Sequence, residues 1–520
     1  MERKTLEESK KWLEACVAPH MGGSLPGFFR ARVVEPEKTA LIHRDRSYTY
    51  AQLHDAIDAT AQALIADLGV SPGDRVVMNL DNSDYTMILY FAIQRAGAVS
   101  VPINPKLTKR EVAHVLGDCT PSAYVCDPSN LPIIESLTGD YPVKVAEIGE
   151  VIRTQVGDVP LPEVTSDMDA TIFYTSGTTG APKGVVHTHE TFIYNAFQSS
   201  AGWQYAFPCS QLDMIPMFHV ASHGWFYPLL AFNGTLVVDT YSTERCFELI
   251  DKHKIEGLNA VPATLLMMVN SDLRDRYDTT SVTNVRFGAS PMPPEKLRAV
   301  QELFPNAQLL HGMGQTESGG TISVLPPELA YEKNGSTGFP IPGFEVRIVD
   351  DRGQEVPTGA HGEVLARGAA VMSRYFNRPE ATEETLAGGW LHTGDLGYLD
   401  EDGCIYLVDR KKDMIIRGGE NVYSVEIENV LITHPSIDSC AVIGVPDTVL
   451  GEKICGIVVT RGTVPDDLIG ELKDLCRREL AGFKVPELWE VIDELPRTAT
   501  GKIQKAPLRA SFLDRQKETQ

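Results

Sequence analysis

A short apolar strand that runs directly into a glycine-rich loop is the feature that most constrains the fold of this chain. Residues 171–174, TIFY, are apolar enough to lie inside a sheet, and residues 175–184, TSGTTGAPKG, follow without a break. In α/β folds, ligands bind at the loops that follow the carboxyl ends of strands. Glycine lets backbone N–H groups approach an anion closely, while hydroxyls and a lysine add donors and positive charge. The segment therefore predicts a phosphate-binding loop.

This loop differs from the P-loop of many nucleotide-hydrolysing enzymes. The P-loop pattern is G-x-x-x-x-G-K-[ST], and its last hydroxyl residue binds magnesium. Here Pro182 precedes Lys183 and Gly184 follows it, so that hydroxyl is missing. The residues therefore favour another kind of nucleotide chemistry.

Alternating segments predict a layered α/β architecture with more than one domain. From Thr49 to Leu131, helical stretches alternate with short apolar runs such as DRVVMNL and AVSVPINP. Residues 338–408 carry turns at DDRG, PTGAHG and DEDG, which predict a β-rich subdomain. The basic stretch DRKKDMIIR opens a segment patterned strand, strand, helix, strand, which indicates a small α+β domain. We expect a large N-terminal domain over residues 1–409 and a small C-terminal domain over 410–520.

Composition excludes several classes of partner. The net charge of −23 would repel nucleic acid and anionic membrane surfaces at long range. ATP is repelled as well, so a nucleotide site has to gather its own basic residues. The nine cysteines include no CxxC pair, which favours reduced, buried thiols over disulfides or a zinc site. The start of the chain has no signal-like apolar segment and no stretch is apolar enough to span a membrane, so we expect a cytoplasmic protein without an integral membrane segment.

Five motifs occur in one order along the chain: YTSGTTGAPKG, HGMGQTES, LHTGDLGYLDEDG, DRKKDMIIRGGENVYSVEIE and PRTATGKIQK. With these motifs the chain resembles the AMP-forming acyl-CoA synthetases of the adenylate-forming superfamily. That superfamily also contains aryl-CoA ligases, luciferases and the adenylation domains of peptide synthetases. The resemblance implies an acid:CoA ligase that uses ATP, Mg²⁺ and coenzyme A. A carboxylate attacks the α-phosphate of ATP, pyrophosphate leaves, and the CoA thiol then displaces AMP.

The resemblance also implies a role for each motif in holding the triphosphate. Thr316 would contact the α-phosphate, and Glu317 would ligate Mg²⁺, a cation that prefers oxygen ligands. The residues expected to bind the β- and γ-phosphates are Ser176, Gly177, Thr178, Thr179 and Lys183.

Adenosine binding is assigned by the same resemblance. Gly288, Ala289 and Ser290 match a segment that lies along the adenine and acyl pocket. Met313 stands where relatives usually have an aromatic residue that stacks on adenine, so a polarizable thioether would replace the ring. Asp395 would accept hydrogen bonds from the ribose hydroxyls. Arg410 would reach the ribose and the phosphates.

The small domain is expected to carry the remaining catalytic residues. Lys502 would bridge the substrate carboxylate and the α-phosphate during adenylation. After adenylation the small domain of relatives rotates, and the pivot position maps onto Lys412. Gly418, Gly419 and Glu420 would line the passage for the pantetheine arm of CoA, although a plain β-turn explains the glycine pair equally well.

The substrate is the least constrained part of the prediction. His219 lies in the gate segment of the family, where peptide-synthetase domains usually have an aspartate, and this argues against an amino-acid substrate. Trp225, Phe226 and Tyr227 are either pocket wall or ordinary core. The segment around them has no cluster of positive charge, so we expect a monocarboxylic acid with an apolar body. A medium-chain fatty acid is the first choice, with an aryl or aryl-alkanoic acid close behind.

Other functions remain open at this stage. A stand-alone adenylating enzyme would load a carrier protein instead of CoA, and a luciferase-like oxygenase would share the first half-reaction. A nucleotide-sensing protein without catalysis is disfavoured because Lys502, Glu317 and Lys183 are all present. A homodimer is one oligomeric state that fits the sequence as well as a monomer does.

Overall fold

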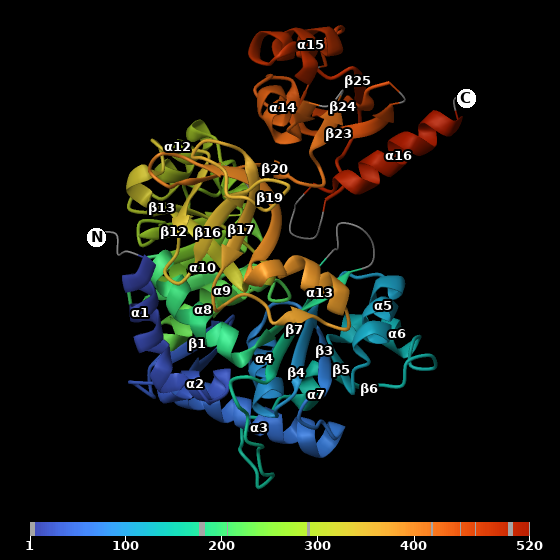
Figure 1. Ribbon diagram of the computed structural model, residues 1–520. Helices are drawn as coiled ribbons and strands as arrows, with labels where there is room; N and C mark the ends of the chain where they lie inside the picture. Colours follow the sequence, from blue (N-terminus) through green and yellow to red (C-terminus); the bar gives the residue numbers. More distant parts are fainter. Residues whose placement is uncertain are drawn as a thin grey trace. The chain divides into compact units, whose positions relative to one another are not determined.

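The computed structural model describes residues 6–175, 182–204, 206–207, 209–288, 292–417, 420–447, 449–462, 464–497 and 503–518. By its internal contacts the chain forms a large unit, residues 1–346 and 365–392, and a smaller unit, residues 347–364 and 393–520. Both units combine helices with sheets (Figure 1). The predicted α/β fold with a large N-terminal and a small C-terminal domain is confirmed.

A mostly parallel sheet carries the glycine loop in the large unit. Its strand order is β18-β8-β7-β4-β3-β5-β6, and β7 is antiparallel to β8 while β4, β3, β5 and β6 run parallel. The strands are β3 Arg75–Asn79, β4 Val99–Ile103, β5 Ala123–Cys126, β6 Lys144–Glu147, β7 Asp169–Thr175, β8 Lys183–Thr188 and β18 Arg374–Tyr375. The apolar run predicted as a buried strand is the centre of β7, where residues 170–173 are all buried.

A second sheet of the large unit has the strand order β2-β1-β10-β9-β11-β12-β13-β14-β15. Strands β10, β9, β11, β12 and β13 run parallel to their neighbours, and β14 turns back antiparallel to β13. The strands are β1 Thr39–His43, β2 Arg46–Thr49, β9 Ser210–Asp213, β10 Thr235–Val238, β11 Gly257–Ala260, β12 Asn284–Gly288, β13 Gln308–Gln315, β14 Gly320–Leu325 and β15 Ser336–Pro340.

Helices pack on these sheets through apolar faces. Leu53, Ile57 and Leu64 of α3 lie one or two turns apart and are nearly inaccessible, as expected for a helix with one buried stripe. The helix starts with a capping box, in which Thr49 and Gln52 satisfy each other's backbone N–H groups. The helices of the large unit are α1 Leu6–Val17, α2 Leu25–Ala31, α3 Tyr50–Leu68, α4 Asp84–Arg95, α5 Lys109–Cys119, α6 Leu131–Glu135, α7 Ile148–Val151, α8 His189–Gly202, α9 Val220–Ala231, α10 Thr243–His253, α11 Pro262–Val269, α12 Pro294–Leu303 and α13 Pro379–Thr385.

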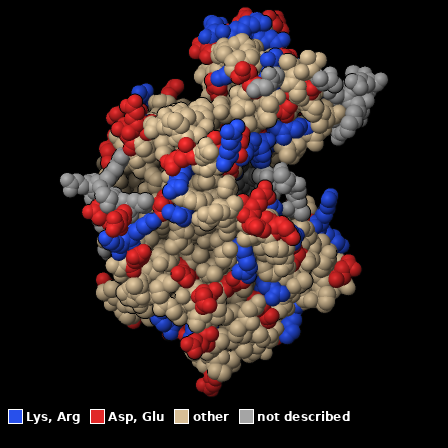
Figure 2. Space-filling model, viewed as in Figure 1, with Lys and Arg blue, Asp and Glu red and all other residues tan. Residues whose placement is uncertain are grey.

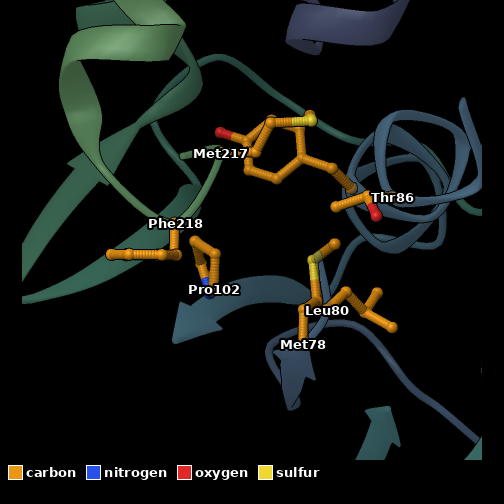
Figure 3. Close-up of a pocket in the computed structure, with 7 residues that line it drawn as sticks. Met78, Leu80, Thr86, Pro102, Met217 and Phe218 are labelled. Carbon is orange, nitrogen blue, oxygen red and sulfur yellow. The ribbon is translucent and has the colours of Figure 1, made fainter. Parts of the chain in front are cut away.

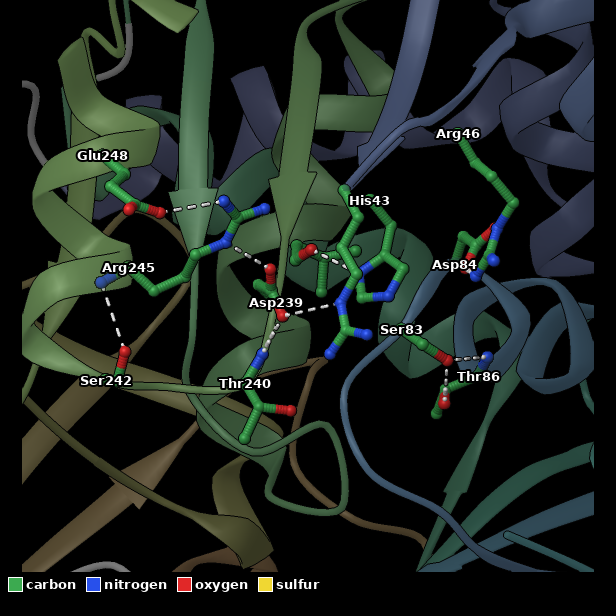
Figure 4. A network of polar contacts seen from close by, with 12 residues as sticks. His43, Arg46, Ser83, Asp84, Thr86, Asp239, Thr240, Ser242, Arg245 and Glu248 are labelled. Atoms are coloured by element: carbon green, nitrogen blue, oxygen red, sulfur yellow. Dashed lines mark hydrogen bonds and ion pairs between the residues drawn. The ribbon is translucent and has the colours of Figure 1, made fainter. Parts of the chain in front are cut away.

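Ion pairs tie strand ends to helix starts in the large unit (Figure 4). The carboxylate of Asp84, at the first turn of α4, is fully buried and accepts two hydrogen bonds from Arg46, at 2.7 and 2.5 Å. Asp239, which follows β10, pairs in the same way with Arg245 of α10 at 2.8 Å. A buried carboxylate needs a charged partner to offset its lost hydration. The Arg46–Asp84 pair joins β2 to α4 across 38 residues, whereas the Arg245–Asp239 pair joins β10 to the helix that follows it.

The smaller unit contains a β-rich part and an α+β part. The β-rich part is formed by β16 Glu345–Val349, β17 Gly362–Arg367, β19 Leu391–Leu399 and β20 Ile405–Arg410, of which β16, β17 and β19 are shared with the large unit at the division points. The α+β part has the sheet order β22-β21-β24-β23, with β25 parallel to β24. Its elements are β21 Ile415–Arg417, β22 Glu420–Val422, α14 Ser424–Leu431, β23 Ile437–Asp447, β24 Gly451–Thr460, α15 Leu468–Glu479, β25 Leu488–Val491 and α16 Lys505–Glu518.

The long β23–β24 hairpin is covered on both faces. Val442, Ile454 and Val458 belong to one buried cluster, which also contains residues of α14 and α15. Ala441, Ile443, Cys455 and Ile457 belong to a second cluster with Leu508 and Phe512 of α16. Alternate residues of a strand face opposite sides of its sheet, so the continuous apolar run of β23 serves both clusters.

The cysteine side chains lie mostly in the interior. All nine cysteines are free thiols, and seven of them are buried. None of the helices among the described residues has the length and apolar character that a membrane span requires. On the face shown in Figure 2, acidic and basic side chains are mixed over the large unit.

Candidate functional site

Lys183 lies near the C-terminal end of the predicted phosphate loop, in the part of the loop that the structure describes. It is the first residue of β8 and lies opposite Thr175, the last residue of β7. The other loop residues predicted to bind phosphate, Ser176, Gly177, Thr178 and Thr179, lie outside the described residues. The β7–β8 pair therefore holds both ends of the loop at neighbouring positions of one sheet.

Glu317 and Lys183 both contact the same tyrosine. Glu317 lies in the short helix Thr316–Ser318 that follows β13, and its Oε1 accepts a hydrogen bond from the hydroxyl of Tyr375 at 2.8 Å. The ammonium of Lys183 lies 4.9 Å from the centroid of the Tyr375 ring, within the range of a cation–π contact. Burial and the nearby charge of Glu317 raise the pKa of Tyr375, so its hydroxyl stays protonated and donates.

His187 holds the backbone of Thr316, the residue that precedes Glu317. Its Nε2 lies 2.8 Å from the carbonyl oxygen of Thr316, so this nitrogen carries the proton and donates. Burial lowers the pKa of His187 to about 4. The imidazole is therefore neutral at physiological pH and orients the Thr316 backbone without adding charge to the site.

This burial predicts a measurable pH dependence of stability. The unfolded chain binds a proton at His187 as pH falls below about 6.5, whereas the folded chain does so only near 4. The contribution is complete above pH 6.5 and is lost as pH falls toward 4. Between about pH 7.5 and 5, the free energy of unfolding should fall by roughly 2 kcal/mol more in the wild type than in His187→Gln.

Urea unfolding of the two proteins at both pH values measures this difference. Buried groups whose pKa shifts do not involve His187 titrate alike in both proteins and cancel: His54 and His189 act in the same direction, while Asp213 acts in the opposite one. An identical pH dependence in both proteins would contradict the assignment of a neutral, buried His187.

A second segment, residues 372–376, fastens the strands around these side chains. The amide of Met372 donates to the carbonyl of Glu317 at 2.8 Å, and the amide of Phe376 donates to Gly184 at 2.7 Å. Arg374 forms a two-bond ion pair with Asp169 at the start of β7, at 2.9 and 2.6 Å. We call residues 372–376 the clamp segment, because its backbone joins the Glu317 turn to the β7–β8 pair.

The donor set around Glu317 fits a magnesium ion that is bound together with a nucleotide. Among the described residues no group of three or more His, Cys, Asp or Glu side chains could hold a metal. Mg²⁺ usually takes one or two carboxylates and completes its shell with phosphate oxygens and water. Glu317 is half-buried, and its Oε2 has no hydrogen-bond partner among the described residues. This one carboxylate would hold the ion, and the ion would neutralise phosphate charge there.

Gly288 and Met313 lie on neighbouring strands of the second sheet. A Cβ at position 288 would lie 2.6 Å from the carbonyl oxygen of Gly312, so the close approach of β12 and β13 requires glycine there. Met313 is 7% exposed, and its sulfur lies 3.9 Å from the Ser323 hydroxyl. Ala289 and Ser290 lie outside the described residues. The roles of Gly288 and Met313 at adenine remain predictions.

His219 caps helix α9, which lies within the predicted gate segment, residues 215–232. Its Nδ1 accepts a hydrogen bond from the amide of Ala221, the second residue of α9, at 3.1 Å. Asn82 brackets the same segment, donating to the carbonyl of Ile215 and accepting from the amide of Met217, at 2.7 and 2.8 Å. The first part of the predicted gate segment is thus held by Asn82 and by the His219 cap.

Helix α9 itself belongs to the core. Trp225, Phe226 and Tyr227 are buried, and Tyr227 shares a hydrogen bond of 2.6 Å with Tyr90 of α4. Asp213, at the end of β9, accepts a hydrogen bond from Ser222 at 2.6 Å, and burial raises the pKa of Asp213 to about 7. The core alternative for this aromatic run is therefore the one that the structure supports.

A small cavity lies beside the gate segment, with Met217 and Phe218 on one wall (Figure 3). The hydroxyls on its wall are engaged elsewhere: Thr86 donates to the carbonyl of Asp81, and Tyr90 pairs with Thr171. Its volume is about 10 Å³, room for roughly one water molecule. The body of a carboxylic acid does not fit there in this structure.

Asp395 and Arg410 meet in the smaller unit. They are directly opposite each other on the antiparallel strands β19 and β20, and their charged groups are 2.6 Å apart. Asp395 is only 7% exposed, whereas Arg410 is partly exposed. The resemblance implies that Asp395 binds the ribose and that Arg410 reaches the ribose and the phosphates; the register of the strands brings these two residues of separate motifs together.

The predicted hinge and CoA residues follow directly after β20. Lys412 lies in a turn in which the amides of Asp413 and Met414 both donate to the carbonyl of Arg410. Lys412 is an exposed residue, and partial desolvation of its ammonium lowers its pKa. Glu420 is exposed at the start of β22 and is opposite Arg417. Gly418, Gly419 and Lys502 lie outside the described residues.

Sequence reasoning missed His187 and Tyr375. Lys183, Val185 and His187 alternate along β8, so a period of two could have indicated that His187 shares the face of Lys183. Tyr375 stands in SRYFNRPE, where no local pattern separates it from other tyrosines. Its partner Glu317 is 58 residues away in the chain.

Comparison with known protein families identifies the chain. The model described as "AMP-binding enzyme" matches residues 28–376, which is more than half of the chain. The chain belongs to the AMP-binding enzyme family. The model described as "AMP-binding enzyme C-terminal domain" matches residues 426–502. The predicted resemblance to the adenylate-forming superfamily is thus confirmed.

Individual relatives of this AMP-binding enzyme cover nearly the whole chain. A fatty acid–[acyl-carrier-protein] ligase, ScoC, of Streptomyces coeruleorubidus is 36% identical and is aligned over 92% of this chain and 94% of its own. A feruloyl-CoA synthase of an Amycolatopsis species is 35% identical, with 93% and 97% covered. The o-succinylbenzoate CoA synthetase of Bacillus subtilis, solved with its acyl-adenylate, is 31% identical, with a TM-score of 0.86 over 94% of this chain and 98% of the other. It was also solved with ATP and a magnesium ion, at a TM-score of 0.84 over 93% and 98%.

Proposed function

We propose that this AMP-binding enzyme is an AMP-forming acid:CoA ligase that activates a monocarboxylic acid. The reaction has two steps. A carboxylate oxygen attacks the α-phosphorus of ATP, and the bond to pyrophosphate breaks, leaving an acyl-adenylate. The sulfur of CoA then attacks the acyl carbon, AMP leaves, and the thiol proton passes to solvent.

The observation that carries this proposal is the meeting of Lys183, Tyr375 and Glu317 at the base of the phosphate loop. The ammonium of Lys183 and the carboxylate of Glu317 both contact Tyr375. The neighbouring strands β7 and β8 hold both ends of the Gly/Thr loop. Phosphoryl transfer depends mainly on positioning and on charge stabilisation. Lys183 would bind the β- and γ-phosphates, and Glu317 would hold the ion that accompanies them.

The other predicted residues divide the remaining tasks. Thr316 would contact the α-phosphate, with its backbone held by His187. Asp395 and Arg410 would bind the ribose. Lys502 would offset the repulsion between the attacking carboxylate and the phosphate.

For the substrate we propose an acid with an apolar body, a medium-chain fatty acid first and an aryl acid second. The gate segment, residues 215–232, contains no Lys or Arg that could pair with a second carboxylate. Burial keeps His223 of α9 neutral by lowering its pKa well below its ordinary value. The relatives named above act on a fatty acid, on ferulate and on o-succinylbenzoate. Because these acids differ, the identity of the substrate has to be measured in an assay.

Mass spectrometry of complete reactions tests this function. The enzyme is incubated with ATP, Mg²⁺ and a panel of straight-chain, branched and aromatic acids, each with and without CoA. We expect acyl-CoA and AMP with CoA, and acyl-adenylate without it, with medium-chain acids giving the most product. No acyl-adenylate with any acid would overturn the function, and a preference for aryl acids would overturn the substrate choice.

Transfer to a carrier protein is the second candidate. The similarity to a fatty acid–[acyl-carrier-protein] ligase favours it, and CoA and carrier proteins present the same pantetheine arm. Acyl-adenylate that persists in the presence of CoA but is consumed when a phosphopantetheinylated carrier protein is added would select this alternative.

The domain boundary at residues 409/410 and the hinge at Lys412 lead to a further prediction. The Lys412 amide donates no backbone hydrogen bond among the described residues, so Lys412→Pro restricts rotation about φ without breaking one. We expect it to slow one half-reaction at least tenfold more than the other, whereas Lys412→Ala, which keeps the rotation, should not. Single-turnover rates of adenylation and of thioester formation measure both steps. Equal effects of the two substitutions would rule out the hinge.

A further inference from the structure

We infer that Tyr375 is a positioning residue that keeps Lys183 and Glu317 apart and oriented for a magnesium–nucleotide complex. This inference rests on the proposed function and adds a residue to it. Its basis is the contact of one neutral side chain with two opposite charges: the hydroxyl donates to Glu317 Oε1 at 2.8 Å, and the ring lies 4.9 Å from the ammonium of Lys183.

The two charges do not neutralise each other. Among the described residues no ion pair joins Lys183 to Glu317, and neither of them forms an ion pair with any other side chain. The neutral side chain of Tyr375 is the group that both of them contact. A direct pair at this position would have to break before a phosphate and a cation could bind. Because Tyr375 contacts both groups, the lysine stays available for phosphate and the carboxylate stays available for the metal.

Tyr375 is itself held rigidly. It is 7% exposed, lies opposite Val185 on β8, and its amide donates to the Thr382 hydroxyl at 2.9 Å. Its neighbour Arg374 points to the other side of the strand and pairs with Asp169. A side chain fixed in this way can orient the groups that it contacts, as outer-shell hydrogen bonds do for metal ligands.

The chemistry separates the two contacts of Tyr375. Tyr375→Phe removes the hydroxyl and keeps the ring, so it releases Glu317 and retains Lys183. Tyr375→Leu removes both contacts. Arg374→Ala is the matched control, because it weakens the same strand through an ion pair that touches neither Lys183 nor Glu317.

Binding measurements without turnover test the inference. Calorimetry with α,β-methylene-ATP in EDTA reports the contact of the nucleotide with Lys183, and the same titration at increasing Mg²⁺ reports the metal site. For Tyr375→Phe we expect unchanged affinity in EDTA and a roughly tenfold loss of the Mg²⁺-dependent gain. Tyr375→Leu should lose affinity in both conditions, and Arg374→Ala in neither. Thermal melting of all four proteins records any loss of folding.

The outcomes distinguish the inference from the proposed function. If the wild type binds the nucleotide without any Mg²⁺-dependent gain, the proposed function fails. If the wild type shows the gain and Tyr375→Phe shows it unchanged, the proposed function stands and the inference is wrong. If Tyr375→Phe loses affinity equally with and without Mg²⁺, or if Arg374→Ala behaves like it, Tyr375 has only a structural role and the inference is again overturned.

Discussion

Replacing Lys502 by alanine should slow adenylation by roughly 10²–10³-fold, the usual effect of removing one donor to a developing charge. The carboxylate and the α-phosphate are both anionic, and the lysine ammonium would offset their repulsion as the new bond forms. Thioester formation starts from an acyl-adenylate that already exists, so it no longer needs this charge. We therefore expect Lys502→Ala to convert supplied acyl-adenylate and CoA at nearly the wild-type rate.

Single-turnover assays of each half-reaction measure the two rates. Lys473→Ala is a suitable control, since Lys473 lies on α15 of the same unit and contributes to no predicted site. A loss of similar size in both half-reactions would show that Lys502 acts on the small domain as a whole. Retention of adenylation would assign the bridging role to another residue.

Replacing Asp395 by alanine should weaken ATP binding by roughly 10–150-fold. A hydrogen bond to a charged group contributes about 1.5–3 kcal/mol, and each 1.4 kcal/mol corresponds to a factor of ten. Asp395 is an acceptor-only carboxylate beside Arg410. We expect its oxygens to accept from the ribose hydroxyls, so the loss should depend on the presence of those hydroxyls.

A comparison of two nucleotides isolates this contact. Calorimetric affinities of wild type and Asp395→Ala for ATP and for 2′,3′-dideoxy-ATP form a double-mutant cycle. The wild type should prefer ATP strongly, and the variant should bind both nucleotides about equally. Asp402→Ala, in an exposed turn of the same unit, serves as the control. An equal loss for both nucleotides would mean that Asp395 acts only by holding Arg410.

These predictions depend on the structure to different degrees. Asp395 was chosen from its motif alone, but its pairing with Arg410 follows from the register of β19 and β20. Lys502 lies outside the described residues, so its prediction rests on its motif. Tyr375 came from the structure alone.

The sequence by itself determined the chemistry and the kind of fold. The loop, the strand before it and the ordered motifs are local segments, and hydrophobic periodicity and glycine placement are visible within a few residues. For the same reason the chain could be assigned to its family before any contact was known, and the α/β layers and the small α+β domain were predicted in chain order.

Only the tertiary structure decided which side chains meet. His187 and Thr316 are 129 residues apart in the chain, and Tyr375 and Glu317 are 58 residues apart, yet each pair is joined by a hydrogen bond. It also decided that His219 caps α9 and that Trp225, Phe226 and Tyr227 lie in the core. Such contacts depend on strand order, register and packing between distant segments, which leave no periodic signal in the sequence around either partner.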